Sequence, residues 1–161
     1  MKHGFIKVAA ATPRVTVADC EANGEEILKA IHEMEKEHVK LMVFPEFCIT
    51  GYTCHDLFLQ RCLLDSAWDE LLHIAEETRE TDALIFVGLP LRHRGKLYNV
   101  AAALNHGRIV GFVPKTYIPN YNEFYEARYF TSGEHVDGTV HIDREAYKER
   151  YDSDFDDVEF D

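Results

Sequence analysis

The sequence predicts an α/β fold, because short apolar runs typical of buried strands alternate with longer segments that have helical periodicity. Three runs of strand length lie at residues 5–11, 40–44 and 82–90, and a helical pattern separates each from the next. After residue 91, two further apolar runs follow with only a short turn between them. This order is typical of an α/β layer whose sheet also contains an antiparallel pair.

The first predicted helix spans Thr16–Glu37 and is amphipathic. The apolar residues that share one face of it are Ile27, Leu28, Ile31 and Met34. The next predicted strand, Lys40–Phe44, ends at Pro45, because proline has no N–H to donate to a sheet. Glu46 is therefore expected just beyond a strand end.

A second long helix is predicted after the turn at Gly51, with Asp56 as its N-terminal cap. Its apolar positions include Leu57, Leu64, Trp68, Leu71, Leu72 and Ala75. The strand at Asp82–Pro90 follows and is almost continuously apolar.

The last third of the chain changes character. Leu97–Leu104 and Arg108–Val113 are predicted to form a hairpin around Asn105, His106 and Gly107. Residues 115–130 are rich in aromatic and polar side chains and have little periodicity, which favours a loop or short helix that lines a site.

Composition excludes several classes of function. The 161 residues carry a formal charge of −12, and nucleic-acid binding requires clustered cations instead. No apolar run approaches the roughly 18 residues that span a bilayer, and no export leader is expected. The four cysteines form no CxxC pair, which favours reduced thiols in the cytoplasm.

Two polar segments follow predicted strands, so Glu46 and Lys115 are candidates to meet beyond the strand ends although 69 positions separate them. A carboxylate beside an ammonium serves as a general base while the cation stabilises an oxyanion. The alternative is a surface salt bridge between two loop ends. No metal site is expected, because His55 lacks a second histidine at ligand spacing.

The strings PEFCITGYTCHDLF and PKTYIPNYNEFYEARYF resemble the carbon-nitrogen hydrolase (nitrilase) superfamily. They are most similar to the glutaminase domain of glutamine-dependent NAD synthetases. The resemblance covers residues 1–133, and residues 134–161 form a divergent tail with 11 acidic and 3 basic side chains. It implies an αββα sandwich of which this chain supplies only the N-terminal part.

The resemblance also implies roles for individual residues. Glu46 takes the place of the general base and Lys115 that of the lysine that supports the tetrahedral intermediate. Glu123 matches a second glutamate beside the lysine, and Tyr52 and Tyr121 fall where aromatic residues shape a glutamine pocket. ATP and magnesium would belong to a separate synthetase domain, so no cofactor is expected in these residues.

The chain departs from the family in its cysteines. The family's nucleophilic cysteine follows the lysine, whereas Cys20, Cys48, Cys54 and Cys62 all precede Lys115. These residues alone are therefore expected not to hydrolyse glutamine. The alternatives are a non-catalytic half-domain that associates with itself or with a full-length synthetase, and another nitrilase-superfamily amidase. The uncovered sheet of a half-sandwich favours a homo-oligomer.

Overall fold

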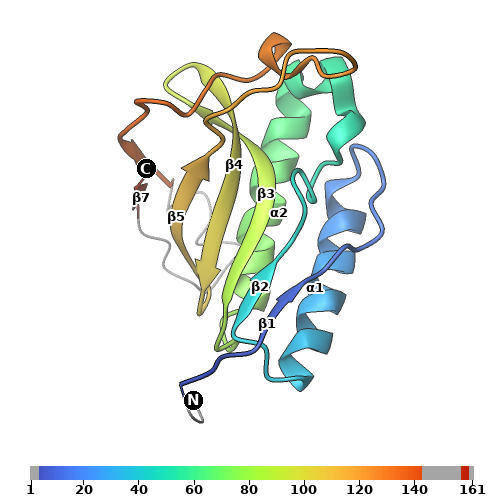
Figure 1. Ribbon diagram of the computed structural model, residues 1–161, viewed down its shortest axis with the longest axis vertical. Helices are drawn as coiled ribbons and strands as arrows, with labels where there is room; N and C mark the ends of the chain where they lie inside the picture. The colour runs from blue at the N-terminus through green and yellow to red at the C-terminus, as the bar shows by residue number, and fades with distance from the viewer. Residues whose placement is uncertain (1–3, 143–156, 160–161) are drawn as a thin grey trace.

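The computed structural model describes residues 4–142 and 157–159 and is built around one mixed sheet (Figure 1). Its strands lie in sequence order: β1 (Val8–Ala10), β2 (Leu41–Val43), β3 (Leu84–His93), β4 (Lys96–Asn105) and β5 (Arg108–Pro114). The first three strands are parallel, and β3, β4 and β5 form an antiparallel meander. The α/β class predicted from the sequence is confirmed, although β1 is shorter than expected.

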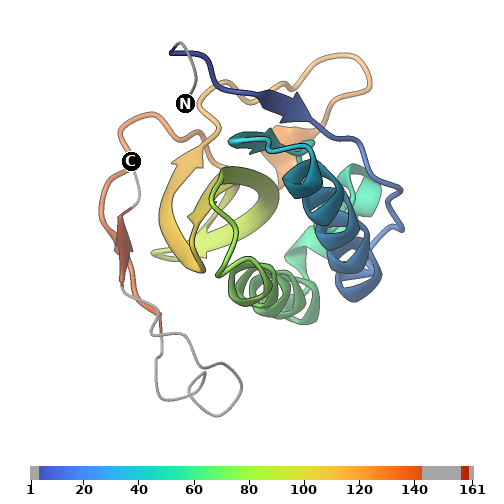
Figure 2. The same ribbon diagram turned by 90° about the horizontal axis from the view of Figure 1, so that it is seen from below.

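Two α-helices, α1 (Cys20–Lys36) and α2 (Arg61–Glu77), lie side by side on one face of the sheet (Figure 2). Alternate residues of β3 point at them, and Ile85, Val87 and Leu89 are almost completely buried. Ile27 and Ile31 of α1 complete this core, as the spacing of the apolar residues predicts. None of the helices among the described residues has the length and apolar character that a bilayer crossing requires.

The predicted cap of the second helix was wrong. Helix α2 begins at Arg61, and residues Tyr52–Leu59 form the irregular 3₁₀ segment η1, which is kinked at His55 with a φ of 50°. Asp56 accepts hydrogen bonds from Arg128 and Tyr129 of a distant loop instead of from the helix (2.9 Å each). A tertiary contact has therefore replaced the local one that the sequence pattern suggested.

Helix α1 approaches α2 at Gly24, where an unusual polar group is buried. The Glu70 side chain lies against Gly24 so closely that an added Cβ would meet its Oε1 at 1.6 Å. Glu70 is 8% exposed, and its Oε1 has no hydrogen-bond partner among the described residues. Burial, followed by repulsion from Glu21 and Glu25, raises the pKa of Glu70 to about 7.

Neither α-helix covers the other face of the sheet (Figure 2). On this open face Ala101 lies directly opposite Val113 in the strand register, and Phe86 lies one row further along the same face. Val113 is 56% exposed. Two short strands, β6 (Thr139–Val140) and β7 (Val158–Glu159), pair with each other near the β5 edge (Figure 1). Of the predicted acidic tail at 134–161, residues 143–156 and 160–161 lie outside the described residues.

Candidate active site

Glu46 is carried by a tight loop that follows β2 and packs against the middle of β3. Phe44 continues the sheet pairing by donating to Phe86 O (2.9 Å), and Pro45 then ends it. The chain turns through Phe47, whose φ of 51° is rare for a bulky residue. This turn buries the Phe47 ring and leaves the Glu46 carboxylate at the surface, with its side chain 38% exposed.

Gly88 of β3 makes room for this loop. A Cβ at Gly88 would lie 2.6 Å from Phe47 N and 2.8 Å from Pro45 O, so only glycine allows the two backbones to come this close. The same glycine accepts a hydrogen bond from Ile49 N (3.3 Å) and donates one to Cys48 Sγ (3.2 Å). The loop that bears Glu46 is thus fixed directly to the sheet.

Lys115 follows β5 and meets Glu46 at the same edge. Its backbone N–H donates to Asn99 O of β4 (2.8 Å), and its carbonyl accepts from Gly133 N (2.9 Å). These bonds hold the start and the end of the 115–133 loop together. Lys115 Nζ donates to Glu46 Oε1 at 2.8 Å, so the two residues lie in contact although 69 positions separate them.

A second carboxylate binds the same ammonium group. Lys115 Nζ lies 2.9 Å from Glu126 Oε2 and 3.0 Å from Oε1, and the Glu126 side chain is 6% exposed. Tyr52 donates from its hydroxyl to Glu126 Oε1 (2.7 Å). Buried carboxylates require such partners, because an unpaired charge is costly to remove from water.

Asn99 completes the cluster from β4 by donating from Nδ2 to Glu46 Oε1. Its register partner is Pro90, which places Asn99 one row beyond Ala101 on the open face. Asn99 is 4% exposed and orients the carboxylate without adding charge. The cluster therefore consists of one ammonium, two carboxylates and two neutral hydrogen-bond donors.

The electrostatics keep the lysine charged. Burial is the largest single influence on Lys115 and lowers its pKa, but hydrogen bonds and Coulomb attraction from Glu46 and Glu126 together outweigh it, so the pKa is raised. Burial and the hydrogen bond to Glu126 raise the pKa of Tyr52, so its hydroxyl remains a proton donor. The site thus presents a permanent cation beside an accessible carboxylate.

Two other residues proposed from the sequence, Glu123 and Tyr121, lie farther from the Lys115 ammonium group. The carboxylate that meets Lys115 is that of Glu126 rather than Glu123, which is exposed. Tyr121 is 63% exposed and packs edge-on against Phe124, with ring centroids 5.6 Å apart. Residues 121–123 thus form the outer part of the loop in this structure.

Two hollows adjoin the charge cluster. One, of about 370 Å³, lies on the open sheet face, where Glu46, Asn99 and Lys115 line its edge and Phe86, Ala101 and Val113 its floor. The other, of about 270 Å³, lies between η1 and the 123–130 segment and is walled by aromatic rings, with Glu126 among its lining residues. The ion pair between Asp56 and Arg128 ties these two segments together.

None of the buried thiols is activated. Burial raises the pKa of Cys48 to about 12 and that of Cys20 to about 11, and it also raises the pKa of Cys54. A thiol must lose its proton to act as a nucleophile, so these three remain inert near neutral pH. Cys62 is exposed near the start of α2 and lines neither hollow.

Sequence reasoning missed Asn99 and Glu126. Asn99 was detectable as a polar residue inside the apolar run 97–104, which is typical of a side chain that serves a site at a strand end. Glu126 and Glu123 follow the same lysine, and only the path of the loop, including the short helix η2 (Glu126–Arg128), decides which one turns inward. No group of three or more metal-binding side chains occurs in the described part of the chain.

Fold and site together define a class: an α/β protein with an acid–base cluster of Glu, Lys and Glu beyond its strand ends. The chain belongs to the carbon-nitrogen hydrolase family, whose model matches residues 7–144. This confirms the family predicted from the Glu46 and Lys115 motifs.

Among curated relatives, the glutamine-dependent NAD⁺ synthetase of Mycobacterium tuberculosis is 40% identical over 141 residues, which cover 88% of this chain and 21% of that protein. The enzyme of the same name from Aquifex aeolicus is 39% identical over 134 residues, covering 81% and 23%. The chain thus spans about a fifth of the length of these relatives.

Solved structures agree with this assignment. A glutamine-dependent NAD⁺ synthetase from Cytophaga hutchinsonii superposes with a TM-score of 0.84 at 31% identity, covering 96% of this chain and 25% of that one. An amidase of the nitrilase superfamily from Nesterenkonia gives a TM-score of 0.68 at 20% identity, covering 85% and 52%. The fold is therefore of the nitrilase type, and it corresponds to about half of the amidase chain.

Proposed function

We propose that this chain forms the acid–base half of a glutamine-hydrolysing site that supplies ammonia for NAD synthesis. The contact that supports the proposal most directly is the one between Lys115 Nζ and Glu46 Oε1, 2.8 Å long and open to the hollow on the sheet face. The similarity to glutamine-dependent NAD⁺ synthetases supports glutamine as the substrate.

In this proposal Glu46 is the general base. Its carboxylate takes the proton of an attacking thiol and gives that proton to the nitrogen that leaves as ammonia when the C–N bond breaks. The regenerated carboxylate then takes a proton from the water that attacks the thioester, and this proton returns to the departing thiolate as glutamate is released. Lys115 stabilises the oxyanion of each tetrahedral intermediate, which requires the ammonium form that its neighbours maintain. Glu126 holds the lysine in place, and Tyr52 lines the aromatic hollow on the substrate side of the site. The proposed role of Tyr121 in shaping the glutamine pocket requires the outer part of the loop to move inward.

The attacking thiol is not among the four cysteines of this sequence. Cys48 is the nearest cysteine to Glu46 in sequence, but its sulfur accepts a hydrogen bond from Gly88 N and its side chain is fully buried. We therefore propose that these residues hydrolyse glutamine only when another polypeptide segment contributes a cysteine. Incubating the chain with glutamine should release no ammonia above the uncatalysed rate, and measurable turnover would contradict this part of the proposal.

A chimera tests the site itself. Residues 1–133 would replace the matching segment of the M. tuberculosis synthetase, and ammonia release from glutamine would be measured. Glu46→Gln should reduce glutamine hydrolysis by about 10²-fold or more, the usual contribution of a general base. Glu77→Gln, an exposed change on α2, is the matched control. Equal activity in the two variants would refute the role of Glu46.

The open sheet face supports a second candidate, a non-catalytic module that associates with itself or with a full-length synthetase. Val43 and Val113 are 41% and 56% exposed and line one apolar hollow, and such patches mark interaction surfaces. A third reading, another amidase of the superfamily, has less support because the amidase structure is only 20% identical.

The remaining attributes follow from the same proposal. ATP and magnesium would act in a synthetase domain, which these residues do not include, so the hydrolytic site needs neither. Cys20, Cys48, Cys54 and Cys62 are free thiols, and we place the protein in the reducing cytoplasm on that ground.

A further inference from the structure

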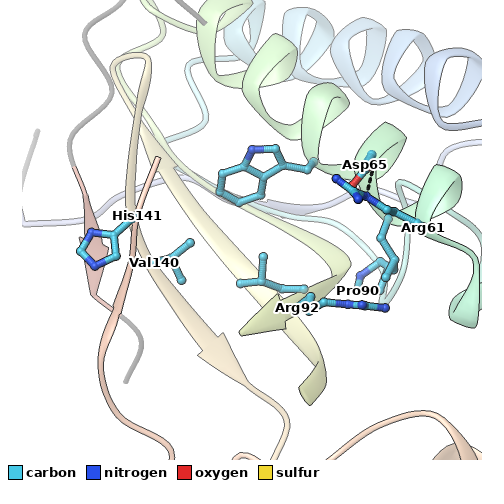
Figure 3. Close-up of a pocket in the computed structure, with 9 residues that line it drawn as sticks. Arg61, Asp65, Pro90, Arg92, Val140 and His141 are labelled. Carbon is cyan, nitrogen blue, oxygen red and sulfur yellow. Dashed lines mark hydrogen bonds and ion pairs between the residues drawn. The ribbon is translucent and has the colours of Figure 1, made fainter. Parts of the chain in front are cut away.

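A third hollow lies on the flank of the molecule and shares no lining residue with the Glu46–Lys115 cluster. It has a volume of about 370 Å³ and is bounded by the first two turns of α2, the second half of β3 and strand β6 (Figure 3). Figure 3 shows Arg61, Asp65 and Arg92 near one end and His141 at the other. Pockets of this size accommodate small organic ligands.

The hollow combines an apolar floor with a cationic rim. Leu64, Leu91 and Val140 are buried beneath it, and the half-buried Trp68 contributes its indole ring. Arg92 is exposed, and its guanidinium group has no ion-pair or hydrogen-bond partner in the part of the chain that the structure describes. Among the described residues, the hollow thus places an apolar surface beside a guanidinium without an acidic partner, although the net charge of the chain is −12.

Arg61 provides a second cation at the same end. Its Nε donates to Asp65 Oδ2 at 3.2 Å, and no contact of its terminal nitrogens occurs within the described residues. The pair is an exposed i,i+4 contact, which stabilises a helix only slightly. It leaves most N–H donors of the Arg61 guanidinium group available to a ligand. Arginine favours carboxylate and phosphate groups because its donors match their oxygens.

We propose that this hollow binds a small organic anion, whose carboxylate or phosphate lies between Arg61 and Arg92 and whose flat apolar body rests on Trp68. The apolar floor contributes contact area, and the two guanidinium groups select the charge. Neutral aromatic compounds lack the ionic contact, and small inorganic ions lack the contact with the floor. The site is independent of the proposed hydrolytic function.

The protein offers an internal probe, because Trp68 is its only tryptophan. Its fluorescence, excited at 295 nm, would be titrated with benzoate and with phenyl phosphate in 0.15 M salt. Benzyl alcohol tests the need for charge, and acetate and inorganic phosphate test the need for an apolar body. Benzoate, phenyl phosphate or both should give a saturable change with at least about tenfold higher affinity than the three controls. The tighter of the two identifies the preferred anionic group.

Two variants locate the binding site. Arg92→Gln should lower the affinity for the preferred anion about tenfold, the loss expected for one charge-assisted contact. Arg61→Gln should lower this affinity as well. Arg108→Gln removes the same charge from an exposed position at the other end of the sheet and should bind like the wild type. Circular dichroism would verify that each variant is folded. A titration that does not saturate, equal affinity for benzyl alcohol, or wild-type affinity in Arg92→Gln would overturn the proposal.

Discussion

Replacing Glu70 by glutamine should remove a pH-dependent loss of stability. The pKa of Glu70 is raised from 4.5 to about 7 in the folded protein. The folded protein therefore favours the neutral form of Glu70. Below pH 4.5 Glu70 is neutral in both states, and the free energy of unfolding has its full value. Stability is lost as the pH rises from 4.5 through 7, because a buried carboxylate then has to ionise beside Glu21 and Glu25.

The magnitude follows from the shift. One pKa unit corresponds to about 1.4 kcal/mol, so Glu70 makes the protein roughly 3 kcal/mol less stable at pH 8 than at pH 4.5. This is a large part of the 5–15 kcal/mol typical of a domain. Glu70→Gln keeps the shape of the side chain but cannot ionise. The variant should lie within about 1 kcal/mol of the wild type at pH 5 and exceed its free energy of unfolding by roughly 3 kcal/mol at pH 8.

Urea unfolding monitored by Trp68 fluorescence at pH 5, 6, 7 and 8 measures this difference. Other carboxyl groups, such as Asp82 with its lowered pKa, also change stability with pH, but they contribute equally to both proteins. Glu77→Gln, on the exposed side of the same helix, is the control and should parallel the wild type. If the Glu70→Gln curve also runs parallel to the wild type across this range, folding does not raise the pKa of Glu70 and the reasoning is refuted.

Three further predictions concern the site and the open face. Lys115→Met should lower the free energy of unfolding by about 2 kcal/mol, because it leaves the buried Glu126 without its cation. Chemical denaturation measures this loss. The double variant that also carries Glu126→Gln should recover part of the lost stability. Gly88→Ala should cost about 1–3 kcal/mol in the same assay, since the added methyl group collides with Phe47 N, and an unchanged unfolding midpoint would refute the close contact. Val113→Lys should reduce self-association of the open face in light scattering, and a monodisperse wild-type monomer at all concentrations would contradict the expected oligomer.

The layered fold was predictable because each element carries its own periodicity. The apolar spacing of Ile27 and Ile31 alone predicts which face of α1 is buried, and Pro45 marks the end of β2. The start of α2 was not predictable in this way. Asp56 precedes an apolar run as a cap would, but its carboxylate binds Arg128, 72 positions away, and no local pattern reports such a contact.

In the candidate site, too, some residues were predictable from the sequence and others were not. Glu46 and Lys115 were identifiable because each follows a strand, and strand ends meet at one edge of a sheet. The choice of Glu126 over Glu123 depends on the path of an irregular loop, and the position of Asn99 depends on the β3–β4 register. Tertiary geometry determines both, and a single sequence does not specify it.

The close approach at Gly88 has a consequence for engineering. Because the main chain of the Glu46 loop rests on the main chain of β3, no side chain between them can be changed to move the carboxylate. For the proposed hydrolytic function, a library of variants aimed at new amide substrates would therefore leave Glu46 in place. Variation would be placed in the 115–133 loop, where Tyr117, Tyr121 and Tyr125 are exposed.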